Sequence, residues 1–129
     1  LAEQPPSEPS SLPVRLAVDD QIGYDMRRRL PAEVELAAYR VVQEAIGNAQ
    51  LHSGGTEIVL DGFIRQGQFE LTVTDNGAGL SNAVIYEAQR RGHLGVSTMR
   101  QRAAAIGATL EIGRGASGGS SVRIHWTGS

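Results

Sequence analysis

The sequence has no cysteine and no long apolar run, and each absence narrows the class of protein. Without cysteine there is no disulfide framework, no thiolate metal site and no thiol nucleophile, so the reducing cytosol is permitted. No stretch of about 18 consecutive apolar residues is present, so we expect no membrane-spanning helix in this chain. Residues 1–6 lack the basic and apolar regions of a signal peptide, and we expect none here.

Neither the net charge nor the histidines indicate binding to nucleic acid, to a membrane surface or to a transition metal. A net charge of −2 over 129 residues gives no electrostatic reason to expect nucleic acid or an anionic membrane surface as a partner. The three histidines lie far apart, without histidine or cysteine neighbours, and so predict no transition-metal site. The P-loop pattern is absent, as is a dinucleotide-binding fingerprint between strand and helix. The basic triplet at residues 27–29 is interpreted as a solvated turn.

Glycine, by contrast, is abundant, with 16 of 129 residues, about 12% against about 7% in an average protein. Most glycines follow residue 54 and fall between predicted elements, where the backbone must turn sharply or approach something closely. Residues 1–13 are rich in proline, serine and glutamate, which predicts a flexible linker. Because the sequence also lacks an initiator methionine, we expect it to be a domain excised from a longer protein.

The longest predicted element is a helix that begins near Pro31 and stops before the glycine pair at residues 54–55. Its apolar face comprises Val34, Ala38, Val41, Val42, Ala45 and Ala49. Along one edge of that face a second set of residues recurs every fourth position, namely Arg40, Glu44, Asn48 and His52. Side chains at this spacing form a row, and this row suits a hard cation that carries phosphates.

The rest of the chain predicts a sheet. Strands are expected at residues 13–18, 56–64, 68–74, 109–112 and 121–126, and a second helix at residues 96–106. Gly67 lies in the tight turn between the second and third strands, where a positive φ is needed. Since strands outnumber helices and short turns join several of them, we predict an α/β (α+β) two-layer sandwich. Its sheet should be mixed and mostly antiparallel, with the helices on one face.

Two glycine motifs are candidates for ligand binding. The run D-N-G-A-G at residues 75–79 follows a strand, and Asp75 either caps its own backbone or accepts a hydrogen bond from an exocyclic amine. In the second case the glycines let the backbone pass beside a flat ring. The run G-H-L-G at residues 92–95 is either a plain loop or an anion site at the start of the second helix.

Together these motifs are more specific than any one of them. The helix with Glu44 and Asn48, the run at 75–79, the run at 92–95 and Ser-Gly-Gly-Ser at 117–120 occur in a fixed order. In that order they strongly resemble the ATP-binding catalytic domain of bacterial sensor histidine kinases, in the GHKL superfamily, most closely the nitrate-sensor and DesK-like subfamily. The resemblance covers about residues 14–126 and implies a Bergerat-type ATP-binding fold.

The resemblance also implies roles for individual residues. Glu44 would polarise water or assist proton removal from the acceptor histidine, Asn48 would coordinate Mg²⁺, and Asp75 would bind the adenine amino group. The other ATP-binding residues it implies are His52, Gly77, Gly79, Gly92, Leu94, Gly95, Val96 and Ser120. Residues 81–93 correspond to the ATP lid, and Leu51 stands where the family often has a phosphate-binding lysine. Arg40 is interpreted as the ion-pair partner of Glu44.

The function implied is transfer of the γ-phosphoryl group of Mg-ATP to a histidine. The acceptor lies on a helical dimerisation domain that this chain lacks, so the chain alone should bind ATP and not phosphorylate itself. Residues 1–13 would be the linker from that domain, and residues 14–129 the catalytic domain. The response regulator would be reached through the full kinase. We expect no contact with nucleic acid or membrane, and a cytoplasmic location whether or not the parent kinase is membrane-anchored.

Three alternatives stay open from the sequence. One is an ATP-binding regulatory module that transfers no phosphate, and the intact Glu44 argues against it. The second is a serine kinase of the anti-sigma-factor type, which would not need the polar linker at residues 1–13. The third is an α/β interaction domain without a ligand.

Overall fold

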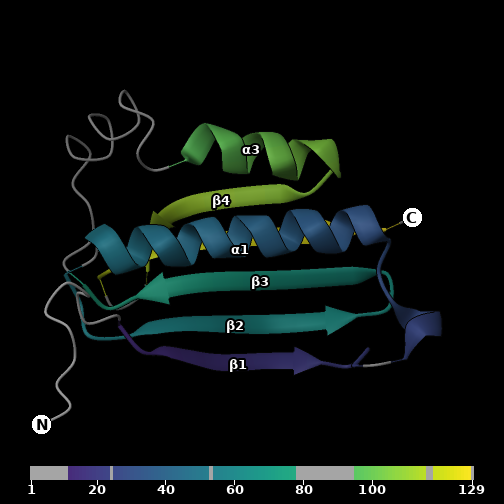
Figure 1. Cartoon of the computed structure of the whole chain (residues 1–129), viewed down its shortest axis with the longest axis horizontal. Helices are drawn as coiled ribbons and strands as arrows, with labels where there is room; N and C mark the ends of the chain where they lie inside the picture. Colours follow the sequence, from purple (N-terminus) through teal and green to yellow (C-terminus); the bar gives the residue numbers. More distant parts are fainter. Residues whose placement is uncertain (1–11, 24, 53, 78–94, 116–117, 129) are drawn as a thin grey trace, which may run out of the picture.

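The computed structural model describes residues 12–23, 25–52, 54–77, 95–115 and 118–128 (Figure 1). In chain order their elements are β1 (Val14–Asp20), the 3-10 helix η1 (Met26–Arg28), α1 (Ala32–His52), β2 (Ile58–Arg65), β3 (Gln68–Asp75), α3 (Val96–Ala105), β4 (Thr109–Arg114) and β5 (Ser120–Thr127). Each predicted helix and strand among these residues is confirmed, with ends that differ by at most two residues. The predicted linker at residues 1–13 lies almost wholly outside the described residues and stays a prediction.

The strands form one sheet in the order β1-β2-β3-β5-β4. The strand β1 pairs with β2 in parallel, and the other neighbours pair antiparallel, which confirms the predicted mixed sheet. Both helices pack on the same face, because their buried residues join alternate residues of β2, β3 and β5 in one core (Figure 1). Neither described helix has the combination of length and apolar character needed to cross a membrane.

Helix α1 covers the middle of the sheet with the predicted apolar face. Val34, Ala38, Val41, Ala45 and Ala49 are buried, and Val42 is partly buried at the edge of the same cluster. The helix begins after Pro31, whose carbonyl oxygen accepts hydrogen bonds from two N–H groups of the first turn, each at 3.0 Å. The buried face therefore fixes which edge of the helix carries the polar row.

Strand β3 is the centre of the sheet, and its side chains alternate strictly between partly and fully buried. Phe69, Leu71 and Val73 point into the core, as the period of two residues requires. Asp75 occupies the next inward position and is only 4% exposed. A carboxylate in this place needs hydrogen-bonding partners, because burying an unpaired charge is costly.

Helix α3 ends shortly before Gly107, and the intervening residue Ile106 is hydrogen-bonded to the last strand, β5. Gly107 has a φ of 71°, the left-handed conformation in which a glycine commonly ends a helix. The indole Nε1 of Trp126 on β5 donates to the carbonyl oxygen of Ile106 at 2.9 Å, and the ring stacks on Phe69 with centroids 6.3 Å apart. Trp126 is therefore a packing residue.

The basic triplet lies at the surface before α1, as expected of a solvated turn. Arg29 makes a two-armed ion pair with Glu35, at 3.0 Å and 2.8 Å, which raises the pKa of the Arg29 guanidinium above its ordinary value. Arg27 lies 3.5 Å from Asp25. These acidic neighbours neutralise part of the positive charge of the triplet. The Arg29–Glu35 pair also links the segment before α1 to the first turn of that helix.

Candidate functional site

The first group of predicted site residues surrounds the end of β3. The Oδ1 atom of Asp75 accepts the N–H of Gly77 at 2.9 Å and the N–H of Ser120, at the start of β5, at 3.4 Å. Among the described residues, Oδ2 of Asp75 has no hydrogen-bond partner. The backbone therefore holds one carboxylate oxygen, which confirms that Asp75 caps its own backbone, and the bond from an exocyclic amine to the other oxygen stays a prediction.

A glycine that the sequence analysis did not single out completes this group. A Cβ on Gly119 would overlap the backbone carbonyl of Asp75 and lie 2.7 Å from its Oδ1 atom. Gly119 is buried, and its carbonyl oxygen accepts the N–H of Gly115 at 2.6 Å across the β4–β5 loop. In the sequence this residue is marked only by the glycine pair directly before the last strand. The folded structure is needed to show that Gly119, and not Gly118, lies against Asp75.

The second group lies where α1 meets α3. Gly95 caps the start of α3 with φ 60° and ψ 22°, and a Cβ there would overlap the carboxylate of Glu44. Val96 follows as the first helical residue and is buried. The structure thus brings Glu44 on α1 together with the predicted phosphate-binding residues Gly95 and Val96, although about fifty positions separate them in the sequence.

Asn48 lies one turn after Glu44 on the same edge of α1 and is half-buried. The interpretation of Arg40 as the partner of Glu44 is wrong: Arg40 is exposed, and within the described ranges no ion pair joins the two. Exposed pairs at this spacing gain only about 0.3–0.5 kcal/mol. The Glu44 carboxylate lies instead beside the backbone of Gly95.

Several predicted residues cannot be compared with the structure. Gly79, Gly92, Leu94 and the predicted lid at residues 81–93 lie outside the described residues. His52 ends α1, but its side chain is likewise outside what the structure describes. Their predicted roles in ATP binding stay predictions.

The donors on α1 fit Mg²⁺ better than a transition metal. Glu44 and Asn48 offer oxygen atoms from one edge of the helix, and oxygen is the ligand that Mg²⁺ prefers. In the part of the chain that the structure describes, no three His, Cys, Asp or Glu side chains cluster as a metal cage would require. This donor set suits an ion that takes one or two protein ligands and completes its shell with phosphate oxygens and water.

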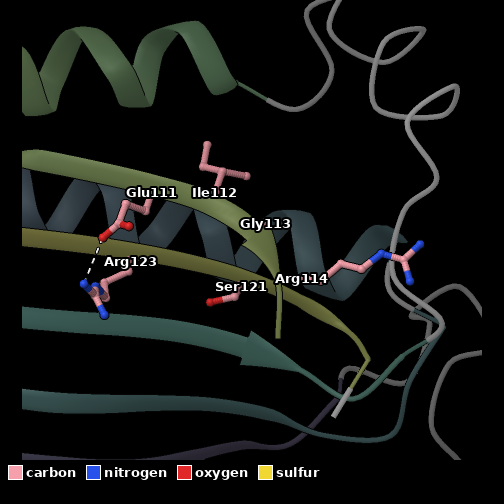
Figure 2. Close-up of a pocket in the computed structure, with 6 residues that line it drawn as sticks. All are labelled: Glu111, Ile112, Gly113, Arg114, Ser121 and Arg123. Carbon is pink, nitrogen blue, oxygen red and sulfur yellow. Dashed lines mark ion pairs between the residues drawn. The ribbon is translucent and has the colours of Figure 1, made fainter. Parts of the chain in front are cut away.

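A cavity of about 260 Å³ lies on β4 and β5, beside the start of β5. Its lining residues are Glu111, Ile112, Gly113, Arg114, Ser121 and Arg123 (Figure 2). Arg123 pairs with Glu111 at 2.9 Å, and Figure 2 shows Arg114 pointing away from that pair. The cavity contains none of the predicted site residues, and its facing charges compensate each other.

The amino-acid sequence is similar to one family of ATPases and to proteins named as sensors. A family model described as histidine kinase-, DNA gyrase B-, and HSP90-like ATPase matches residues 33–128. The sensor protein VraS of Staphylococcus haemolyticus is 36% identical over 84 residues, and VraS of Staphylococcus aureus is 34% identical over 84 residues. Each alignment covers 65% of this chain and 23% of the relative, so the match spans about a quarter of those proteins.

Two solved structures share the fold. The histidine kinase domain of a blue-light activated histidine kinase from Erythrobacter litoralis has a TM-score of 0.65 at 24% identity, over 88% of this chain and 51% of that one. The ATP binding domain of PrrB from Mycobacterium tuberculosis has a TM-score of 0.61 at 24% identity, over 93% of this chain and 82% of that one. At these identities the likeness establishes the fold alone, and it confirms the predicted α/β architecture.

Proposed function

Because the match spans residues 33–128, the chain belongs to the family of histidine kinase-, DNA gyrase B-, and HSP90-like ATPases, and we propose that it is the catalytic ATP-binding domain of a two-component sensor histidine kinase. The observation that carries this proposal is the carboxylate of Asp75. It is buried at the end of β3, held through Oδ1 by two backbone N–H groups, and its Oδ2 atom has no partner in the described residues. An adenine amino group is the kind of donor that this oxygen would accept.

The roles of the other residues follow from the two groups. Ser120 and Gly77 border the adenine side, where the Ser120 hydroxyl supports a water-mediated contact. Gly95 and Val96 lie at the start of α3, where backbone N–H groups and the helix dipole favour phosphate oxygens. Gly79, Gly92, Leu94 and His52 complete the proposed set of ATP-binding residues.

Glu44 and Asn48 serve the transfer step. Bound Mg²⁺ would neutralise charge on the phosphates, and Asn48 is its proposed protein ligand. Glu44 accepts or orients the proton that leaves the acceptor histidine, and its contact with Gly95 keeps its carboxylate beside the proposed phosphate site. Positioning and electrostatic stabilisation account for most of the catalysis in phosphoryl transfer.

The acceptor histidine lies on a helical dimerisation domain joined through residues 1–13. This part of the proposal is supported by the relatives named as sensor proteins, of which the match covers 23%. The full kinase would then pass the phosphoryl group to a response regulator. The domain acts in the cytoplasm, where its ATP is supplied.

Calorimetry of ATP binding with and without Mg²⁺ tests the binding site. Asp75→Asn keeps an oxygen for the Gly77 N–H but presents an amide donor to the adenine amine, so affinity should fall about 10- to 100-fold. Asp61→Asn makes the same change at an exposed position of β2 and should bind like the unmodified chain. If the unmodified chain fails to bind millimolar ATP, the proposal is wrong.

Phosphotransfer separates a kinase domain from an inert nucleotide-binding module. The chain is mixed with Mg-ATP and the histidine-bearing hairpin of its parent kinase, and labelling of the hairpin is followed. Glu44→Gln should retain ATP binding and lose transfer about 100-fold or more, as expected for a general base. Glu33→Gln, in the exposed first turn of the same helix, should keep both. Labelling of a serine on another protein, with none on the hairpin, would favour the anti-sigma type.

A further inference from the structure

The side chain of Asn76 joins two loops that are twenty residues apart in the sequence. Its Oδ1 atom accepts the N–H of Thr56 at 2.8 Å and the N–H of Glu57 at 3.0 Å. Its Nδ2 atom donates to the Thr56 hydroxyl at 2.9 Å. The backbone N–H of Asn76 also donates to the Glu57 carbonyl, at 3.3 Å. One residue thus ties the segment before β2 to the residue that follows Asp75.

The first of these loops leaves no space for a side chain at its closest point. A Cβ on Gly55 would lie 2.5 Å from Asn76 Oδ1 and 2.6 Å from the Gly77 nitrogen. The loop therefore packs directly on the amide of Asn76 and on the peptide that supplies the Gly77 N–H. This contact and the hydrogen bonds place the segment after α1 against the turn that follows β3.

The position of Asn76 between Asp75 and Gly77 gives these contacts a consequence for the site. The Gly77 N–H donates to Asp75 Oδ1 at 2.9 Å, so its direction helps to set how the carboxylate is turned. The Asn76 amide can make all its bonds at once only with its oxygen toward the two N–H groups and its nitrogen toward the hydroxyl. The anchored peptide between them has little freedom to rotate.

We propose that Asn76 is a positioning residue for Asp75: by fastening the Asn76–Gly77 peptide to the loop at residues 54–57, it holds the carboxylate in the orientation that selects a 6-amino purine. This inference rests on the proposed function, because it assumes that Asp75 recognises the adenine amine. It adds a specificity role for a residue that does not contact the nucleotide.

The test is the ratio of affinities for ATP and inosine triphosphate, which carries a carbonyl oxygen in place of the adenine amine. Calorimetry with the full chain gives both dissociation constants. A loss of folded protein lowers both affinities equally and cancels in the ratio, whereas a turned carboxylate changes the ratio. We expect the unmodified chain to prefer ATP by about 10- to 100-fold, as the loss of one hydrogen bond to a charged group implies.

Asn76→Ala removes the three side-chain hydrogen bonds and should reduce the preference for ATP by about threefold to tenfold. Asn76→Asp keeps an acceptor for the N–H groups of Thr56 and Glu57 and should stay within about twofold of the unmodified ratio. Gly55→Ala disrupts the same contact from the other loop and should also reduce the ratio of affinities for ATP and inosine triphosphate. Gly113→Ala, where a Cβ would meet open space, is its matched control and should leave the ratio unchanged.

The outcomes separate the two proposals. An unchanged ratio in both Asn76→Ala and Gly55→Ala, with ATP still bound, would overturn the role of Asn76 and leave the proposed function intact. Absence of ATP binding by the unmodified chain would overturn the proposed function and this inference with it. If Asn76→Ala does not fold, as circular dichroism would reveal, Gly55→Ala against Gly113→Ala decides the question alone.

Discussion

Replacing Gly119 by alanine tests how closely the start of β5 approaches Asp75. The φ of Gly119 lies outside the positive range, so alanine can adopt the backbone conformation, and the cost of the change is steric. The added Cβ would overlap the Asp75 carbonyl oxygen and lie 2.7 Å from both the carbonyl carbon and Oδ1. Two of these three atoms belong to the backbone of the central strand, which cannot rotate away as a side-chain end can.

The magnitude follows from known costs of overpacking. Inserting a methyl group into filled space lowers the free energy of unfolding by about 1–3 kcal/mol. Gly113→Ala on the neighbouring strand β4 is the matched control, because its φ is also compatible and no atom lies within 4 Å of its Cβ. That change should raise the free energy of unfolding by about 0.4–1 kcal/mol, since alanine restricts the unfolded chain. The same effect on the unfolded chain applies to Gly119→Ala and cancels in the comparison, so the two variants should differ by the steric cost of about 1–3 kcal/mol.

Urea unfolding followed by tryptophan fluorescence measures this difference. The sequence has one tryptophan, Trp126, and its ring stacks on Phe69 in the core, so its emission reports on the whole sheet. Gly119→Ala should also weaken ATP binding at least tenfold, because the Asp75 carboxylate must shift, while Gly113→Ala should not. Equal stability and equal ATP affinity in the two variants would refute the close approach of Gly119 to Asp75.

Three further outcomes are expected. Gly95→Ala and Gly107→Ala should each lower the free energy of unfolding in urea by about 1–2 kcal/mol, because both glycines have a positive φ. Only Gly95→Ala should also impair histidine phosphorylation, and equal activity of the two variants would count against the role of Glu44. If Gly95→Ala is more destabilising than Gly107→Ala, the difference should vanish when Glu44 is also replaced by alanine. A double-mutant cycle measures this coupling, and a difference that persists without Glu44 would contradict the contact. Trp126→Phe should cost about 1–2 kcal/mol in thermal unfolding followed by circular dichroism, since the Ile106 carbonyl loses its donor; an unchanged midpoint would argue against that hydrogen bond.

The local structure was predictable from the sequence because its signals are local. The apolar spacing of α1, the alternation along β3 and the glycine in the turn at residue 67 each depend on a few neighbouring residues. Strand β1 ends at Asp20, two residues later than predicted, because its pairing with β2 continues to Ile64. That extension depends on a partner strand, so the residues of β1 alone do not predict it.

The site was predictable in its residues but not in its contacts. Resemblance to a family indicated Glu44 and Gly95 separately, yet spacing along the helix suggested Arg40 as the partner of Glu44. The structure instead turns this carboxylate to the start of α3, a contact between distant parts of the chain. For the same reason the sequence did not reveal the packing of Gly119 on Asp75 or the anchoring of Asn76, since each contact forms only once the sheet is assembled.

The parallel pairing of β1 with β2 has a consequence for the order in which the sheet assembles. The β2–β3 hairpin closes through a two-residue turn at residues 66–67, whereas β1 can pair only after the 37 residues from 21 to 57, with α1 among them, are in place. Closing a loop of that length costs about 3 kcal/mol of chain entropy. We therefore expect β1 to join after the β2–β3 hairpin and to open before it, so that its amide hydrogens exchange with solvent before those of β3 in native-state exchange. The edge of the sheet where the preceding chain enters would thus be released more easily than the central strand that carries Asp75.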